Sequence, residues 1–309
     1  MMIPDNWAVI LNDIVDHIYE VQKGEWKDYV GQLYNVQKSK HQTETHYGAG
    51  EMGQMMEWNL SGNKVSYEDV DPNYQKTYTH KKYSKGFQVE KELLDDERYD
   101  VIKGKPKKLA RVEGYTRQVL GMSVFNNAFS SAAANLGPDS KSLCNSAHPA
   151  GPSNTGTTFS NASTLVLNAT NLETLRNNAL GGSTQWKDDK GNMLVVDFDT
   201  LLVPPALRKT AMIIADTTEE PMTSDHSVNV WKGSLNVIEC PFLNSSTTAW
   251  FMIDSSRMSD YLHWFDREHT GLKFGGYDFD SDVAKYAIKS RISYGFDHWS
   301  FVSGSTGTG

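Results

Sequence analysis

The chain has 309 residues, of which 39% are hydrophobic and 22% are charged, and its formal net charge at pH 7 is −8. This composition is typical of a soluble globular protein of one large domain or two ordinary ones, and it excludes an intrinsically disordered chain. The excess of acidic residues excludes a dedicated nucleic-acid-binding protein, although an acidic chain can still lie near DNA without adhering to it.

The N-terminal region predicts a helix followed by an adaptable loop. Apolar residues recur at three- and four-residue steps between Trp7 and Tyr19, and they form a stripe that needs a partner surface. Residues 48–62 have the composition of a loop rich in methionine. The first residues lack a signal peptide, and no run approaches the roughly 18 apolar residues of a membrane span. We therefore expect synthesis in the cytoplasm and no membrane anchor.

Two extended segments, residues 64–70 and 77–89, are rich in Tyr, Val, Thr and Phe, and a turn at Asp71-Pro72-Asn73 joins them. Alternation is regular in the second segment and slips near Tyr78, as at a bend or bulge. An isolated two-stranded hairpin is marginally stable in water, and this one carries too many charges for a core strand pair. We therefore expect the hairpin to lie on a neighbouring copy of the same protein.

The residues predicted to contact neighbouring copies lie on the N-terminal helix, the loop and the hairpin. They are Trp7, Ile14, Trp58, Tyr67, Glu68, Asp69, Asp71, Tyr78, Lys81, Lys82, Tyr83, Lys85 and Phe87. As solvated pairs, the charged members contribute about 0–1 kcal/mol each. Across a subunit boundary they set register and partner choice, which is the interpretation we favour.

A single long helix is predicted over residues 106–136, with Pro106 in its first turn and Gly137-Pro138 after its end. At 1.5 Å per residue it would be roughly 45 Å long. Two helices that break at Gly121 remain an alternative. The apolar residues predicted for its buried face are Leu109, Val112, Tyr115, Val119, Met122, Phe125, Phe129 and Ala132.

The second half of the chain predicts short helices and strands in alternation. A helix is expected over residues 171–180, capped by Thr170 or Asn171, and another over 206–215 after Pro204-Pro205. Extended segments are expected over residues 194–203, 228–240, 249–253 and 285–302. The whole order predicts an α+β protein without internal repeats.

Three passages resemble major capsid proteins of tailed bacteriophages. Residues 201–207 (Leu-Leu-Val-Pro-Pro-Ala-Leu) resemble a strand–Pro-Pro–helix passage of that family, residues 287–299 its closing strand, and residues 83–89 the return of its extended loop. In order and spacing the likeness covers nearly the whole chain, and it is closest to the Mu-like major head subunits within the Hong Kong 97-type capsid fold.

The resemblance implies a particular division of the chain. It places an N-terminal arm at residues 1–47 and an extended β-hairpin loop at 48–95. A peripheral domain with a long spine helix would cover residues 96–199, an axial domain 200–282, and a closing strand that returns to the peripheral domain 283–309.

The resemblance also implies a structural role without catalysis or cofactors. The chain would be a major capsid protein of a tailed bacteriophage or prophage, located in the virion and made in the host cytoplasm. Its copies would form the pentamers and hexamers of an icosahedral head. The implied partners are further copies, a separate scaffold protein, a portal protein and packaged double-stranded DNA in loose contact, with no membrane. An encapsulin-type nanocompartment shell and an α+β hydrolase remain alternatives.

Candidate chemical sites in the sequence are weak. Cys144 and His148 make half a zinc site, Cys240 has no close histidine, and we expect two reduced, partly buried thiols. Histidines near acidic residues are interpreted as hydrogen-bonding partners rather than a metal or acid–base site: His263, His269 and His298 near Asp260, Asp266, Glu268 and Asp297. The run Asp278, Asp280 and Asp282 lacks the Gly and Glu of an EF-hand, which leaves only weak cation binding open.

Overall fold

The computed structural model describes residues 7–24, 27–57, 65, 67–219, 228–268, 271–278 and 280–308. The helices in this part of the chain are α1 (Trp7–Lys23), α2 (Tyr29–Leu33), α3 (Lys91–Asp95), α4 (Tyr99–Asn126), α5 (Ala169–Leu180), α6 (Arg208–Asp216) and α7 (Ser255–Tyr261). The strands are β1 (Asn35–Lys38), β2 (Thr43–Ala49), β3 (Pro72–Thr79), β4 (Lys81–Glu90), β5 (His148–Gly151), β6 (Asn154–Phe159), β7 (Ala162–Ser163), β8 (Thr200–Val203), β9 (Asn236–Glu239), β10 (Trp250–Ile253), β11 (Leu262–Glu268), β12 (Leu272–Asp278), β13 (Val283–Phe296) and β14 (Val302–Ser305).

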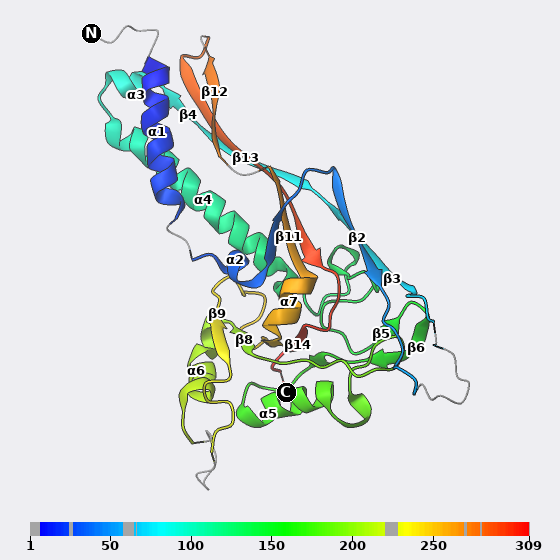
Figure 1. Cartoon of the computed structure of the whole chain (residues 1–309). Helices are drawn as coiled ribbons and strands as arrows, with labels where there is room; N and C mark the ends of the chain where they lie inside the picture. Colours follow the sequence, from blue (N-terminus) through cyan, green and yellow to red (C-terminus); the bar gives the residue numbers. More distant parts are fainter. Residues whose placement is uncertain are drawn as a thin grey trace.

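The largest sheet is built around β13, a strand of 14 residues. Strand β4 runs antiparallel to it over ten residue pairs, from Val283 with Glu90 to Ile292 with Lys81. Strands β12 and β11 pair with successive parts of β13, and β1 adds to β11 in parallel. Helices α1 and α4 lie side by side next to this sheet in the upper half of Figure 1.

A second sheet, in the order β7-β14-β10-β8-β9, lies in the lower half of the molecule (Figure 1). Every residue of β8 and of β10 is buried, as expected for central strands covered on both faces. Leu172 of α5 and Ile214 of α6 contribute to the same core cluster as Trp250 of β10. In the described part of the chain, no helix combines the length and apolar character needed to cross a membrane.

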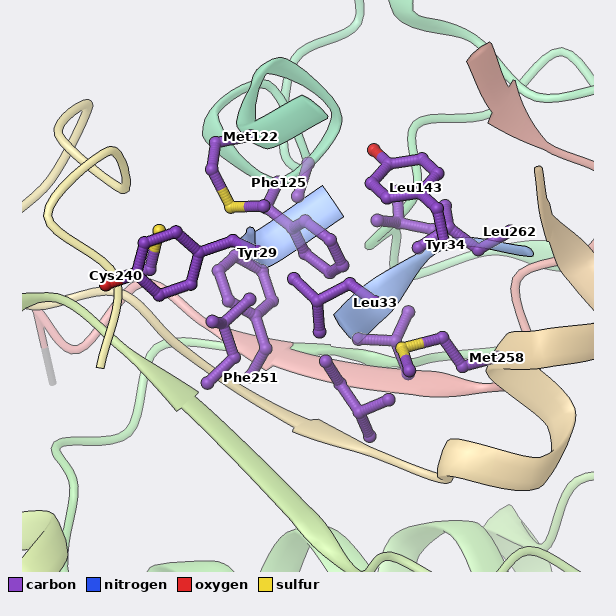
Figure 2. Close-up of a cluster of buried hydrophobic side chains, with 14 of the residues drawn as sticks. Tyr29, Leu33, Tyr34, Met122, Phe125, Leu143, Cys240, Phe251, Met258 and Leu262 are labelled. Atoms are coloured by element: carbon purple, nitrogen blue, oxygen red, sulfur yellow. The ribbon is translucent and has the colours of Figure 1, made fainter. Parts of the chain in front are cut away.

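Helix α2 belongs to the core of its own chain. Figure 2 shows Tyr29, Leu33 and Tyr34 among the buried side chains of α4 and β10. The Tyr34 hydroxyl donates a hydrogen bond of 2.6 Å to the carbonyl of Gly121 in α4. Gln118 of α4 accepts hydrogen bonds from two backbone N–H groups at the start of α2. The N-terminal arm predicted at residues 1–47 is therefore not a free limb, because its second helix completes the core.

Helix α1 also finds its partner surface within the chain. Leu11, Val15 and Tyr19 are buried, and they pack in clusters that include residues of α4 and β13. The Tyr19 hydroxyl donates to a carboxylate oxygen of Glu113 on α4. Ile14 of the same helix is 46% exposed. The expectation that the apolar stripe of this helix requires another subunit was therefore wrong.

The predicted pairing of the hairpin is also corrected. Residues 77–79, which end β3, pair with residues 43–45 of β2 and not with residues 64–70. Residues 65 and 67–70 form no strand. The chain leaves the β2–β3 hairpin at His80 and continues as β4 on the edge of β13, so the irregularity predicted near Tyr78 lies close to a change of sheet. Strand β4 is therefore a member of the largest sheet and not one arm of a projecting ribbon.

The long helix is confirmed as one element with different ends. It starts seven residues before Pro106 and ends at Asn126, ten residues before the predicted end. Its length is about 42 Å, from 28 residues at 1.5 Å each. The Asn127 side chain donates to the carbonyl of Ser123, and Asn126 Nδ2 donates to the carbonyl of Phe242. These two asparagines end the helix and join it to a neighbouring loop.

The predictions for the second half are closer to the structure. Helix α5 is capped by Asn168, two to three residues earlier than expected, and the predicted helix after Pro205 is α6, preceded by a 3-10 turn. Both cysteines are free and buried, as expected.

The predicted domain boundary between residues 282 and 283 does not follow the sheets. Strands β11 and β12 pair with β13, whereas β7 and β14 join the second sheet.

We predict opposite effects for two glycine substitutions in α4. A Cβ atom at Gly121 would lie 2.5 Å from Cγ2 of the fully buried Val30, whereas a Cβ at Gly104 would meet nothing within 4 Å. Gly104→Ala should stabilise the subunit by up to about 1 kcal/mol through the higher helix propensity of alanine. Gly121→Ala should destabilise it by roughly 1–3 kcal/mol, the usual cost of overpacking.

Urea unfolding of the unassembled subunit, followed by circular dichroism, measures both effects. Gly104→Ala serves as the matched control, because the same substitution is made in the same helix. An equal gain in stability for both variants would contradict the described packing of α2 on α4.

Candidate assembly surfaces

The loop between β2 and β3 exposes many large apolar side chains. Met55 is 100% exposed and Tyr67 is 92% exposed. Single exposed apolar residues are ordinary, but a concentration of them in one segment marks an interaction site. We call the described residues from 47 to 70, which comprise the end of β2 and most of the loop after it, the apolar loop. Its exposed apolar side chains are Tyr47, Met52, Met55, Met56, Val65, Tyr67 and Val70.

Polar contacts hold the apolar loop against the body of its own chain. Lys190 Nζ lies 2.9 Å from Glu68 Oε1 and 3.0 Å from Asp71 Oδ2. Asn192 Nδ2 donates to the Met52 carbonyl over 3.0 Å. The hydrogen bond from Lys190 lowers the pKa of Glu68 below its ordinary value. Two acidic residues predicted for a subunit boundary therefore have a cation in their own chain, where they position the loop.

A second candidate surface lies on α4. Val112, Tyr115 and Val119, which the sequence assigned to the buried face, are 41%, 52% and 37% exposed. They follow one another at spacings of three and four residues, so they form one stripe on the helix. Met122 and Phe125 of the predicted face are buried as expected. The sequence therefore predicted the apolar spacing of the helix, but not that it carries an inner and an outer apolar face.

The remaining predicted interface residues differ in accessibility. Tyr83 and Phe87 are half-buried, and Phe87 stacks on Tyr286 with ring centroids 5.2 Å apart. Those that are exposed to solvent are Ile14, Tyr67, Asp69, Lys81, Lys82 and Lys85. The exposed set can therefore contact another copy without rearrangement of the subunit.

Of the other predicted interface residues, one is buried and two are not described. Tyr78 is only 3% exposed, and its hydroxyl donates to Asp297, so it offers no surface to a neighbouring copy. Trp7 is the first residue of α1, and its side chain lies outside the description. Trp58 also lies outside the described residues.

A polar cavity of about 870 Å³ is lined by residues of the β2–β3 hairpin and of the segment that follows β13. On its wall, His46 of β2, His263 of β11 and Asp297 just after β13 bring their ligand-type atoms within 4.8 Å of one another. We call these three residues the His–Asp cluster. Asp297 Oδ2 lies 2.5 Å from His46 Nδ1 and 3.0 Å from His263 Nε2, while Tyr78 donates to Oδ1.

The electrostatics of the cluster favour an ionised Asp297. Burial raises the pKa of this carboxyl, but hydrogen bonds from His263, Tyr78 and His46 outweigh burial and lower the pKa below its ordinary value. The sequence had grouped His263 with Asp297 and missed His46. That residue belongs to a polar strand 217 positions earlier in the chain, and no local signal connects the two histidines. The predicted partner His269 lies outside the described residues.

The other predicted polar groups have structural partners. His148 stacks on Trp299 at 4.5 Å between ring centroids, and its Nδ1 lies 2.6 Å from Asp139 Oδ2. Within the described residues, Cys144 and His148 are not members of the metal-type cluster formed by His46, His263 and Asp297. Asp278 forms an ion pair of 2.6 Å with Lys285. His148 and Asp278 therefore have partners within their own chain.

The architecture defines a class of protein: a subunit with a long helix beside a large sheet, a second sheet below, and an accessible apolar loop, as in the Hong Kong 97-type capsid fold. The profile of the phage capsid protein family matches residues 73–302, which is most of the chain. The chain therefore belongs to the phage capsid protein family, and it is a structural protein of the virion. No curated protein matches its sequence.

Solved structures share the fold at low sequence identity. A chain from the procapsid of bacteriophage JBD30 is 15% identical with a TM-score of 0.53, over 99% of this chain and 76% of that one. A chain from Mycobacterium phage Adephagia is 16% identical with a TM-score of 0.53, over 91% and 90%. A chain of the virus-like particle from Pyrococcus furiosus is 11% identical with a TM-score of 0.50, over 95% and 98%.

We predict that acid destabilises the subunit partly through His298, which lines the polar cavity. Burial and the neighbouring His148 lower the pKa of His298 from 6.5 to about 4, and its Nδ1 accepts a hydrogen bond from the backbone N–H of Ser300. The unfolded chain binds a proton near pH 6.5, whereas the folded chain does so only near pH 4. The stability from neutral His298 is therefore present above pH 6.5 and is lost as the pH falls toward 4.

The free energy of unfolding should fall by up to about 1.4 kcal/mol per pH unit in this window. Urea unfolding between pH 7.5 and 4.5 measures the slope. His298→Gln should flatten it, while the control His17→Gln, at an exposed position of α1, should leave it unchanged. An identical slope in His298→Gln would show that other groups account for the acid sensitivity.

Proposed function

We propose that copies of this chain form the pentamers and hexamers of an icosahedral phage head that encloses double-stranded DNA. The observation that carries the proposal is the apolar loop, which exposes seven large apolar side chains in a member of the capsid family. Rings of identical subunits require heterologous contacts, in which one surface patch meets a different patch of the next copy. The apolar loop and the stripe on α4 are two such patches.

The charge of the chain is consistent with loose contact to packaged DNA. A net charge of −8 opposes tight binding to phosphates, so DNA can be packed and released without adhering to the shell. Further partners in the proposal are a portal protein and a separate scaffold protein that guides assembly. The chain would be synthesised in the host cytoplasm. The narrower assignment to the Mu-like branch remains a prediction.

An encapsulin-type nanocompartment is the second candidate, because the virus-like particle from Pyrococcus furiosus has the same fold over nearly its whole chain. The two functions differ in contents. A phage head protects double-stranded DNA from added nuclease, whereas a nanocompartment encloses cargo proteins. The neighbouring genes also distinguish the two functions. A gene for a portal or terminase indicates a phage head, whereas a gene for a cargo enzyme indicates a nanocompartment. The α+β hydrolase is not favoured by any residue group of the described structure.

We predict that the apolar loop is required for assembly but not for folding. Substitution of Met52, Met55 and Met56 by serine removes apolar surface that the subunit itself does not bury. The variant should keep its circular dichroism spectrum and melting temperature, since these side chains are exposed. It should form at least tenfold fewer shells, measured by electron microscopy and size-exclusion chromatography.

The matched control replaces the same three methionines by leucine, which keeps apolar area and volume. This variant should assemble with a yield close to that of the unmodified protein. Normal shells from the serine variant would remove the apolar loop from the set of assembly surfaces and would leave the stripe on α4 as the candidate.

A further inference from the structure

We propose that His46, His263 and Asp297 bind a divalent transition-metal ion, with zinc as the best fit, and that this ion fastens the β2–β3 hairpin to the body of the subunit. A metal site of this kind goes beyond the role of the chain in a shell. Its ligands come from β2, from β11 and from the residue just after β13, and they converge at the wall of the polar cavity.

The three side chains already bring their ligand atoms around a single oxygen atom. Two imidazole nitrogens, His46 Nδ1 and His263 Nε2, approach the same carboxylate oxygen, Oδ2 of Asp297, at 2.5 and 3.0 Å. The two rings meet edge to face with centroids 4.6 Å apart. Without an ion, both nitrogens must donate protons to one oxygen. An ion bound between the two nitrogens and Oδ2 accepts lone pairs from all three and needs only small side-chain rotations.

A neighbouring tyrosine holds the carboxylate of Asp297 in place. The Tyr78 hydroxyl donates to Oδ1 and so leaves Oδ2 as the ligand oxygen. Hydrogen bonds of this kind to a ligating carboxylate orient it and raise metal affinity. Tyr78 is a buried residue of the hairpin, next to the largest sheet. Its ring centroid lies 5.1 Å from that of Phe265. The positioning hydroxyl is therefore fixed by packing.

The chemistry of the donors selects the metal. Imidazole and carboxylate ligands suit zinc and neighbouring transition metals, whereas magnesium and calcium prefer sites made only of oxygen. Three protein ligands leave the fourth tetrahedral position to water, which the cavity supplies. Besides Asp297, four carboxylates line this cavity against three cationic side chains, Lys76, Lys187 and Arg257. This balance favours the entry of a cation.

The site would connect segments that are distant in sequence. His46 belongs to the hairpin that leads into the apolar loop, whereas His263 and Asp297 belong to the largest sheet and its end. A bound ion would therefore restrict the angle at which the hairpin leaves the body. The loop would be oriented before it contacts a neighbouring copy.

The test uses full-length protein without a histidine tag, dialysed against zinc at micromolar free concentration. Plasma mass spectrometry should find about one zinc per chain, and EDTA should lower the melting temperature by several degrees, reversed by added zinc. Cobalt substitution should give the intense visible absorption of a tetrahedral site. His46→Asn and Asp297→Asn should each weaken zinc binding at least tenfold.

Two further variants make the test specific. His17→Asn, on the exposed side of α1, is the matched control and should keep full zinc binding. Tyr78→Phe keeps all three ligands, removes the positioning hydroxyl and should weaken binding by several-fold. Unmodified protein that binds no zinc would overturn the proposal and leave a hydrogen-bonded cluster. Equal zinc binding by His46→Asn and by the control would overturn it as well, because the metal would then lie elsewhere.

Discussion

Pairing along both edges of β13 is the constraint on which the rest of the subunit depends. One edge holds β4 over ten residue pairs, and β12 and β11 occupy the other pairings in succession. Strand β13 therefore connects β4, which follows the apolar loop and β3, with β11 and β12 near the end of the chain. Helices α1 and α4 lie next to the sheet that these strands form. Because β4 is fixed in register, the place where β3 ends and the chain enters this sheet is fixed too.

The N-terminal segments extend this constraint to α4. Buried side chains of α1 and α2 cover its inner face, and the polar atoms of Gln118 and Gly121 on α4 bond to α2. Once that face is covered, the outer stripe around Tyr115 remains accessible. The surfaces available to neighbouring copies are thus what remains after the chain has completed its own core.

The sequence predicted elements with strong local signals and failed where distant segments decide the structure. The Pro204-Pro205 break, α5, β10 and β13 were recognised because caps, breakers and apolar alternation mark them. The hairpin was paired wrongly because β2 is the polar run Thr-Glu-Thr-His-Tyr-Gly-Ala, which lacks apolar alternation. The end of α4 could have been found from Asn126-Asn127, since asparagine favours helix ends. The contact of His46 with His263 has no local signal.

Magnitudes decide which residues of the loop supply affinity and which supply orientation. The ion pairs of Lys190 with Glu68 and Asp71 are exposed, and exposed pairs contribute little to binding free energy because solvent screens them. A large apolar side chain that becomes fully buried contributes roughly 1.5–3 kcal/mol. Seven such side chains on each apolar loop therefore outweigh its charges as a source of binding free energy.

The ion pairs act before two subunits meet, because they hold the apolar loop in one orientation within the free subunit. Ordering a loop during association costs binding free energy, and a loop that is already ordered avoids most of that cost. If the apolar loop contacts a neighbouring copy as proposed, the acidic residues first assigned to a subunit boundary would favour assembly from within their own chain. Their effect would reach the neighbouring copy through the position of the methionine and tyrosine side chains of the loop.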